Sequence, residues 1–203
     1  MTLKKAICIF IAICMVTSLC ACSNVQSAIT EDRYVRGNIV GDTWTSSWLG
    51  ISYTLTDGFS FTSEEELCEL MQITSDMIFE DEQGKSYVDY FMVDTVYEMM
   101  AYHDDGSNVV VISEMNMTGL SEEEYMSYIR LQIIQAAIEY NFTDLYDFQI
   151  GALTMKRCDG TTYEYGDLLY QTYILLDRGD RIVSVVVSAP QKETVENIIS
   201  SFG

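Results

Sequence analysis

His103 is the only histidine in the 203-residue chain, so a nucleophile–histidine–carboxylate arrangement would have to form around it. It lies in the stretch YHDDG, where Asp104 and Asp105 are near enough in sequence to orient an imidazole. The sequence has no G-x-S-x-G nucleophile elbow, and no cysteine is a sequence neighbour of His103. We therefore expect a solvated turn histidine, no catalytic residue and a protein that is not an enzyme.

Acidic runs are the second feature that could do chemistry, because calcium binds several carboxylate oxygens at once. Three runs stand out, at residues 64–66, 80–82 and 122–124. None follows the EF-hand pattern, and the spacing of zinc ligands is absent. Two of the runs come where helices begin, and the helix dipole favours acids at that end. The sequence predicts weak cation attraction, no dedicated metal site and no cofactor.

Aromatic residues could form a binding surface by stacking on cell-wall sugars or contacting a protein partner. They gather in two parts of the chain, at Trp44 and Trp48 and at Tyr163, Tyr165, Tyr170 and Tyr173. The alternative is that tyrosine suits half-buried strands, which alone accounts for the enrichment. We favour the second interpretation, so the binding residues stay unknown at this point.

The first 21 residues have the form of a secretory signal peptide. MTLKK supplies positive charge, and AICIFIAICMVTSL is an apolar run too short for a typical membrane span. The ending LCAC resembles the lipobox of bacterial lipoproteins. In that family the last cysteine, here Cys22, receives a diacylglycerol thioether after cleavage just before it. Two acyl chains of the palmitate kind would give stable anchoring. The alternative is an ordinary signal peptide cut after Ala21.

This reading divides the chain into a signal peptide at 1–21, a lipidated cysteine and tether at 22–36, and a single globular domain at 37–203. Without Lys4 and Lys5 the mature part has a formal charge near −22. Such a charge excludes nucleic acid, which proteins bind by neutralising phosphates. We expect a location at the extracytoplasmic face of the cell membrane, with an envelope protein or a cell-wall component as a partner. Cys68 and Cys158 could pair as a disulfide or remain thiols.

The spacing of apolar residues predicts the elements. Strand-like pieces fill residues 37–58, and two strands flank the turn HDDGSN at residues 103–108. Capping boxes predict two helices, with Ser63 and Glu66 at the first and Ser121 and Glu124 at the second. The second helix is expected to run to Tyr140. Three or four strands follow between residues 148 and 189, with turns at CDGT, YGD and DRGD, and a last helix comes after Pro190.

The stretch IVSVVVSA has apolar residues on both parities, which is typical of a strand covered on both faces. The turn DRGD is too short for a parallel crossover, so its flanking strands pair antiparallel. These two observations predict an α+β fold in which an antiparallel sheet lies between helices, a three-layer α/β/α sandwich.

The order of pieces resembles bacterial lipoproteins of the PsbP-like family. The resemblance lies in GISYTLTDGFSFTSEEEL, in VYEMMAYHDDGSNVVVISEM followed by LSEEEYMSYI, and in VENIISSF. Thr56 stands where that family commonly has proline, and Phe59 where it commonly has tryptophan. The resemblance implies the three-layer fold over residues 37–203, but these motifs concern packing and imply no activity.

The sequence therefore favours a membrane-anchored extracytoplasmic lipoprotein with a non-catalytic binding or interaction domain. Two alternatives remain open. One is an accessory solute- or cation-binding component of a transporter. The other is a cell-envelope hydrolase that uses carboxylates.

Overall fold

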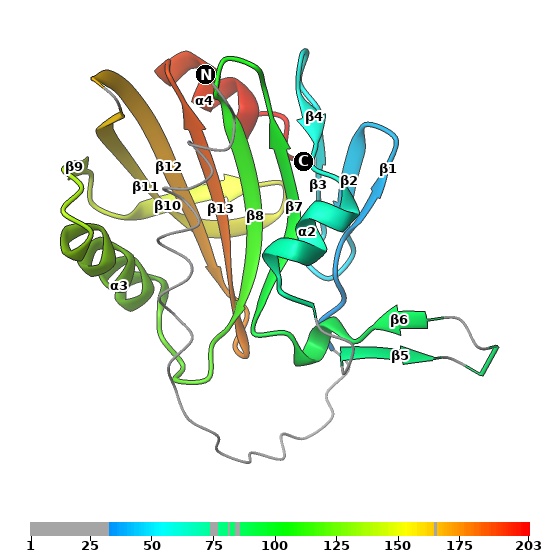
Figure 1. The fold of residues 1–203 in the computed structure, drawn as a ribbon. Helices are drawn as coiled ribbons and strands as arrows, with labels where there is room; N and C mark the ends of the chain where they lie inside the picture. Colours follow the sequence, from blue (N-terminus) through cyan, green and yellow to red (C-terminus); the bar gives the residue numbers. More distant parts are fainter. Residues whose placement is uncertain (1–32, 74–76, 81, 84–85, 165) are drawn as a thin grey trace.

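The computed structural model describes residues 33–73, 77–80, 82–83, 86–164 and 166–203 (Figure 1). The lipidation site at Cys22, the signal peptide and most of the expected tether lie outside these residues. The described elements follow one another as β1 (Asn38–Val40), β2 (Thr43–Ser46), β3 (Ile51–Thr54), β4 (Ser60–Phe61), α2 (Glu64–Leu70), β5 (Ile78–Glu80), β6 (Ser86–Val88), the 3-10 helix η3 (Tyr90–Met92), β7 (Thr95–Tyr102), β8 (Asn108–Met115), α3 (Glu122–Gln135), β9 (Tyr140–Phe142), β10 (Tyr146–Ile150), β11 (Leu153–Glu164), β12 (Asp167–Asp177), β13 (Arg181–Ala189) and α4 (Lys192–Ile199).

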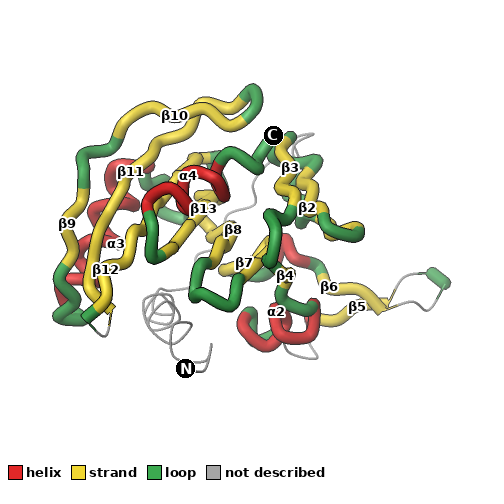
Figure 2. The backbone as a smooth tube through the Cα atoms, turned by 90° about the horizontal axis from the view of Figure 1, so that it is seen from above, coloured by secondary structure: helices red, strands yellow, loops and turns green. Residues whose placement is uncertain are grey.

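The main sheet is antiparallel and has the strand order β10-β11-β12-β13-β8-β7-β4, with β9 paired to β11. The expected turns at DRGD and HDDGSN join β12 to β13 and β7 to β8. The fold is therefore α+β, as the sequence predicts. Seen from above, strands β9 to β12 curve around α4 (Figure 2).

Burial explains why β13 does not alternate in sequence, because all nine of its residues are buried. The apolar side chains form two clusters. The smaller one joins Ile129 and Ile133 of α3 to Tyr173 and Leu175 of β12. The larger one contains Leu67 of α2, most of the sheet and the apolar face of α4, which is made by Val195, Ile198 and Ile199.

Both capping boxes form as predicted. Ser63 accepts from the backbone N–H of Glu66, and the Glu66 carboxylate accepts from Ser63 in return. Ser121 and Glu124 repeat this arrangement at α3. The acidic runs at 64–66 and 122–124 are therefore the first turns of α2 and α3, where they face the positive end of the dipole.

Helix α3 is shorter than the sequence predicts, because it ends at Gln135 rather than near Tyr140. Ala136 and Ala137 are exposed, and Tyr140 belongs to β9. Ala137 takes a positive φ of 57°. The chain turns away there so that residues 140–142 can pair with β11. Pairing across the sheet outweighs the helix propensity of two alanines.

The expected turn at CDGT is wrong, because Cys158–Thr161 lie inside β11. There Asp159 faces Thr172 of β12, and Gly160 faces Gln171 on one side and Phe142 of β9 on the other. A Cβ atom at Gly160 would lie 2.9 Å from the Phe142 ring. This glycine serves a close approach of two strands and makes no turn.

The packed part begins before residue 37, where the sequence analysis places the start of the domain. Tyr34 is only 3% exposed, and its hydroxyl donates to Glu98 Oε1 at 2.6 Å. The guanidinium of Arg36 donates to the Tyr97 carbonyl at 2.9 Å. The other end of the chain is fixed as well, since Gly203 and Ser52 of β3 exchange backbone hydrogen bonds.

Strands β5 and β6 form a separate two-stranded hairpin that projects from the body in both views (Figures 1 and 2). The expected turn DEQGKS connects them, but three of its residues lie outside the described ones. Within the described ranges, no helix is both long enough and apolar enough to cross a membrane.

Candidate functional site

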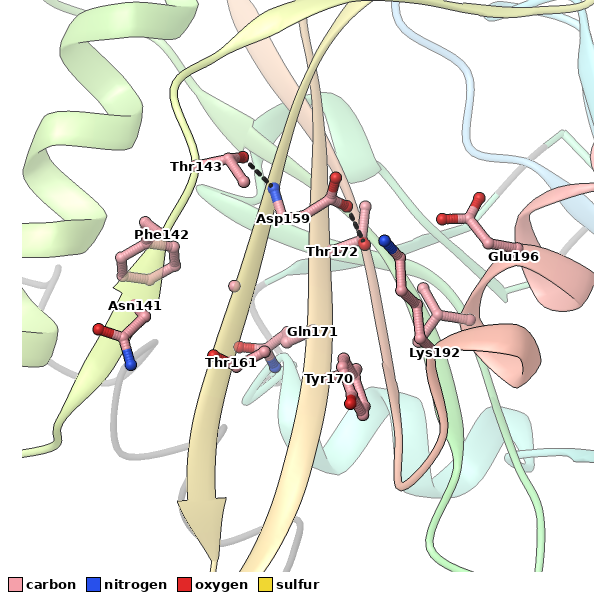
Figure 3. Close-up of a pocket in the computed structure, with 12 residues that line it drawn as sticks. Asn141, Phe142, Thr143, Asp159, Thr161, Tyr170, Gln171, Thr172, Lys192 and Glu196 are labelled. Atoms are coloured by element: carbon pink, nitrogen blue, oxygen red, sulfur yellow. Dashed lines mark hydrogen bonds between the residues drawn. The ribbon is translucent and has the colours of Figure 1, made fainter.

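A cleft of about 310 Å³ lies between β9, β11, β12 and α4. Figure 3 shows the side chains that surround it. The strands contribute Asn141, Phe142, Thr143, Asp159, Gly160, Thr161, Tyr170, Gln171 and Thr172, and the helix contributes Lys192, Val195 and Glu196. These residues come from three regions of the chain, and the curvature of the sheet around α4 brings them together.

Asp159 is the best-anchored polar group of the cleft. Its Oδ1 accepts from Thr172 Oγ1 at 2.6 Å and from Arg157 Nε at 2.9 Å, and its Oδ2 accepts from the Tyr146 hydroxyl at 2.8 Å. Partial burial raises the pKa of Asp159, but these three hydrogen bonds outweigh burial and hold that pKa below its usual value. Asp159 is therefore an ionised acceptor with a fixed orientation.

Arg157 connects the sheet to α4 at the edge of the cleft. It is 4% exposed, and its Nη1 donates to Glu196 Oε2 at 3.0 Å while its Nη2 contacts Glu196 Oε1. Burial lowers the pKa of Arg157, but the hydrogen bonds to Glu196 and Asp159 outweigh it and raise that pKa overall. Burial and the hydrogen bond to Asp159 also raise the pKa of Tyr146 to about 12. Two carboxylates thus share one bidentate arginine.

The β9 side of the cleft is fixed by the backbone. Thr143 accepts at Oγ1 from the Asp159 N–H at 2.9 Å, and its own N–H donates to the Asp159 carbonyl at 2.8 Å. The missing side chain at Gly160 lets the Phe142 ring approach β11 closely. This wall is therefore preformed.

Charges around the cleft compensate one another. Asp159 and Glu196 supply two negative charges, and Arg157 and Lys192 supply two positive ones. Lys192 is exposed at the α4 side, and Thr161 lines the floor between the charges. The site therefore offers hydroxyl, amide and charged groups together with aromatic rings, but no net charge.

His103 is placed in the β7–β8 turn, as expected. Its side chain is 33% exposed, and its Nδ1 accepts from the Asp105 N–H and lies 2.9 Å from Asp105 Oδ1. Burial raises the pKa of Asp105, but hydrogen bonds from Ser107 and His103 outweigh it and lower that pKa overall. These contacts explain His103 as part of the turn.

The acidic runs do not converge. Two of them cap helices, and one residue of the third, Asp81, lies outside the described residues. Among the residues that the structure describes, no group of three or more His, Cys, Asp or Glu side chains is placed to hold a metal ion.

Most of the aromatic candidates are buried in the core. Trp44, Trp48 and Tyr173 are 0%, 9% and 3% exposed. Tyr170 lines the cleft, whereas Tyr163 is 68% exposed on β11. Tyr165 lies outside the described residues. Strand packing therefore accounts for most of the enrichment, and one tyrosine of the set belongs to the cleft.

The two cysteines of the domain are free thiols. Cys68 is half-buried on α2, and Cys158 is buried, with its Sγ 3.3 Å from the Thr143 carbonyl. The possible disulfide between them is not formed.

Sequence reasoning missed the residues that build the cleft. Asp159 was assigned to a turn, and Thr172, Lys192 and Glu196 carried no motif. The signal that could have found the site is Gly160, because a glycine within a strand often marks a close approach of another backbone or ligand.

No protein-family model matches the sequence, and no curated protein matches it in sequence. Two solved structures are similar in fold. One is PsbP (CyanoP) from Synechocystis sp. PCC 6803, with a TM-score of 0.44, 8% identity and coverage of 88% of this chain and 98% of that one. The other is LpqN of Mycobacterium tuberculosis, a protein involved in cell envelope biogenesis, with a TM-score of 0.32, 8% identity and coverage of 74% and 76%. A PsbP fold is thus among the matches, as the sequence resemblance predicts. These scores assign no residue a role.

Proposed function

We propose that the chain is an extracytoplasmic lipoprotein, anchored through Cys22, whose domain binds a small neutral polar ligand without transforming it. A sugar ring of the cell envelope has the required chemistry. The observation that supports this proposal is the preformed cleft between β11, β12 and α4, whose charges cancel. Its volume of about 310 Å³ lies at the small end of the range for ligand sites.

Neutrality of the ligand follows from the compensated charges. A cationic ligand would meet the Arg157 and Lys192 side chains, and an anionic one would meet Asp159 and Glu196. A neutral ring with hydroxyl groups instead finds donors and acceptors of both kinds, with Thr161 among them. Phe142 and Tyr170 add ring surface for its apolar faces.

The absence of a suitable general acid supports binding over hydrolysis. A carboxyl group that donates a proton near neutral pH needs a raised pKa, whereas the pKa of Asp159 is lowered. Glu196 is held by Arg157 as an ion pair at the same edge. The carboxylate-dependent hydrolase is therefore the weaker alternative, and the described residues offer no geometry that favours the transporter accessory.

We also infer that helices cover both faces of the sheet. Successive residues of a strand point to opposite faces. In β12, Tyr173 and Leu175 belong to the cluster of α3, whereas Ile174 and Leu176 belong to the cluster that contains α4. Both helices contact β12. This placement supports the expected α/β/α layers, and it puts the cleft on the α4 side.

The test compares three sugars of similar shape and different charge. N-acetylglucosamine is neutral, glucosamine is cationic and glucuronate is anionic. Titration of the full chain, followed by calorimetry, should show binding of N-acetylglucosamine in preference to the other two. Equal binding of the charged sugars, or no binding of any, would contradict the proposal.

Two threonines of β11 provide the matched variants. Thr161→Val removes a hydroxyl from the cleft floor and should weaken binding about 5-fold, the effect of one hydrogen bond. Thr154→Val makes the same change at an exposed position outside the cleft and should leave affinity unchanged. The cleft is not the site if both variants behave alike.

A further inference from the structure

The β5–β6 hairpin exposes large apolar side chains that a water-facing hairpin does not need. Ile78, Phe79 and Tyr87 are 47%, 42% and 50% exposed. Phe79 and Tyr87 are cross-strand neighbours, with ring centroids 5.9 Å apart. Met92 of η3 and Val35 add exposed fractions of 61% and 56% near the root of the hairpin. We call these five residues the hairpin patch.

The chain enters the described domain beside this patch. Arg33 Nη2 lies 3.0 Å from Asp89 Oδ2, and the Arg33 guanidinium lies 5.3 Å from the centre of the Phe91 ring. Asp89 directly follows β6. The next residues are held firmly, since Tyr34 is buried against Glu98. The point from which an N-terminal anchor would pull is therefore fixed at the root of the hairpin.

Chain length limits how far this point lies from an anchored membrane. Eleven residue steps separate Cys22 from Arg33. Fully extended they span at most about 40 Å, and as a flexible chain they span about 20 Å on average. With lipid on Cys22, the root of the hairpin stays within a few nanometres of the bilayer.

We propose that the hairpin patch contacts the lipid bilayer and places its aromatic and aliphatic side chains in the interfacial region. This inference rests on the proposed lipid anchor at Cys22. Aromatic side chains with an apolar body and a polar edge favour that depth. The anchor holds the molecule near the surface, and the patch then orients it with β5 and β6 toward the lipid.

Charge determines which lipids the patch prefers. The exposed Glu80 is at the end of β5, and the whole chain has a formal charge of −20. Anionic headgroups repel such a surface. The contact therefore favours zwitterionic phosphatidylcholine, weakens when anionic lipid is added and recovers at high salt, which screens the repulsion.

Tryptophan quenching by brominated lipid tests the contact. The full chain is purified with its own lipid and reconstituted in phosphatidylcholine vesicles that contain brominated acyl chains. Phe79→Trp places a reporter in the patch. Leu131→Trp is the matched control, because Leu131 is 51% exposed on α3, far from the hairpin in both ribbon views. The native Trp44 and Trp48 are buried and provide the background.

Quenching of Phe79→Trp should exceed that of Leu131→Trp by about 2-fold or more, as expected for a ring at the interface. Equal quenching overturns the proposal. So does a Phe79→Trp signal that responds to protein concentration instead of brominated lipid, because the patch would then cover a second copy of the chain.

The intact mass of the purified chain separates this inference from the proposed anchor. A mass without lipid contradicts the anchor at Cys22. The same variants are then held on the vesicles by an N-terminal hexahistidine tag and a nickel-chelating lipid, where quenching again decides. A lipidated mass without quenching contradicts the hairpin contact alone.

Discussion

Glu98 is a carboxylate that the fold buries almost completely, with an exposed fraction of 1%. Its oxygens accept from the Tyr34 hydroxyl at 2.6 Å and from the Gly37 N–H at 2.7 Å. Burial raises the pKa of Glu98 despite these bonds. Arg181 is 1% exposed, donates to backbone carbonyls and stacks 4.1 Å from the centre of the Tyr34 ring. Individual residues of the N-terminal segment therefore complete the polar core of the sheet.

Glu114 gives the domain a measurable pH dependence. Burial raises its pKa from 4.5 to about 7, and its carboxylate contacts Thr95 and the Tyr125 hydroxyl. Between these two values the folded chain holds more protons than the unfolded chain, so stability falls as pH rises from 4.5 to 7 and then levels off. Glu114→Gln should remove this decline, gaining at most about 3 kcal/mol above pH 7 from about 1.4 kcal/mol per pKa unit.

Chemical denaturation of the two proteins at pH 5 and pH 8 measures the difference. Glu122→Gln, at the exposed start of α3, is the control and should keep the decline of the parent chain. A Glu114→Gln variant whose stability falls with pH as steeply as the parent would contradict the assignment.

At the scale of elements, two helices end in the same way. In α3 the Ile138 N–H donates to the Ile133 carbonyl and the Ala137 N–H to the Ile134 carbonyl, which is the Schellman pattern. Helix α2 ends with the same pair of bonds around Gln72. The left-handed position is held by Ala137 with a φ of 57° and by Gln72 with a φ of 52°. Glycine normally takes this position, because a Cβ is strained there.

Replacing Ala137 with glycine should therefore stabilise the domain by about 0.5–1 kcal/mol, by relieving the strained conformation. Ala136→Gly is the matched control one residue earlier. Ala136 has a φ of −75°, so glycine there should destabilise by a similar amount through added unfolded-state entropy. Thermal or urea unfolding of both variants measures the two signs, and two changes of the same sign would contradict the explanation.

These elements also show what the sequence can predict. The starts of α2 and α3 depend on residues three apart, such as Ser121 and Glu124, so the pattern is local and visible. The end of α3 and the course of β11 through Gly160 depend on pairing with β9, which is distant in the sequence from most of β11. Local turn and helix propensities pointed the other way at both places, and tertiary pairing prevailed.

For the whole molecule, the sheet was predictable because β13 has apolar residues on both parities. The cleft was not, because Asp159, Thr172 and Glu196 come from separate elements and meet only through the curvature of the sheet. No spacing rule in one sequence encodes such a meeting. Gly160 was the one local sign of it.

The anchor is a prediction about the whole molecule, made from the sequence at residues outside the described ones. Cys22→Ser removes the sulfur that would form the thioether, so the chain should move from the membrane fraction to the soluble fraction when cells are fractionated. Cys20→Ser is the control, because it changes a cysteine two residues earlier that takes no lipid in the lipobox reading. Membrane retention of Cys22→Ser would contradict the anchor.

The partnership of Tyr34 with Glu98 also sets where a protease could shed the domain intact. A cut between Cys22 and Arg33 would leave the buried carboxylate with both of its donors, so the freed fragment would keep its native core. A cut after Gly37 would remove both donors at once and leave a desolvated acid without partners in the middle of the sheet. Release of a functional ectodomain is therefore confined to the few residues nearest the lipid.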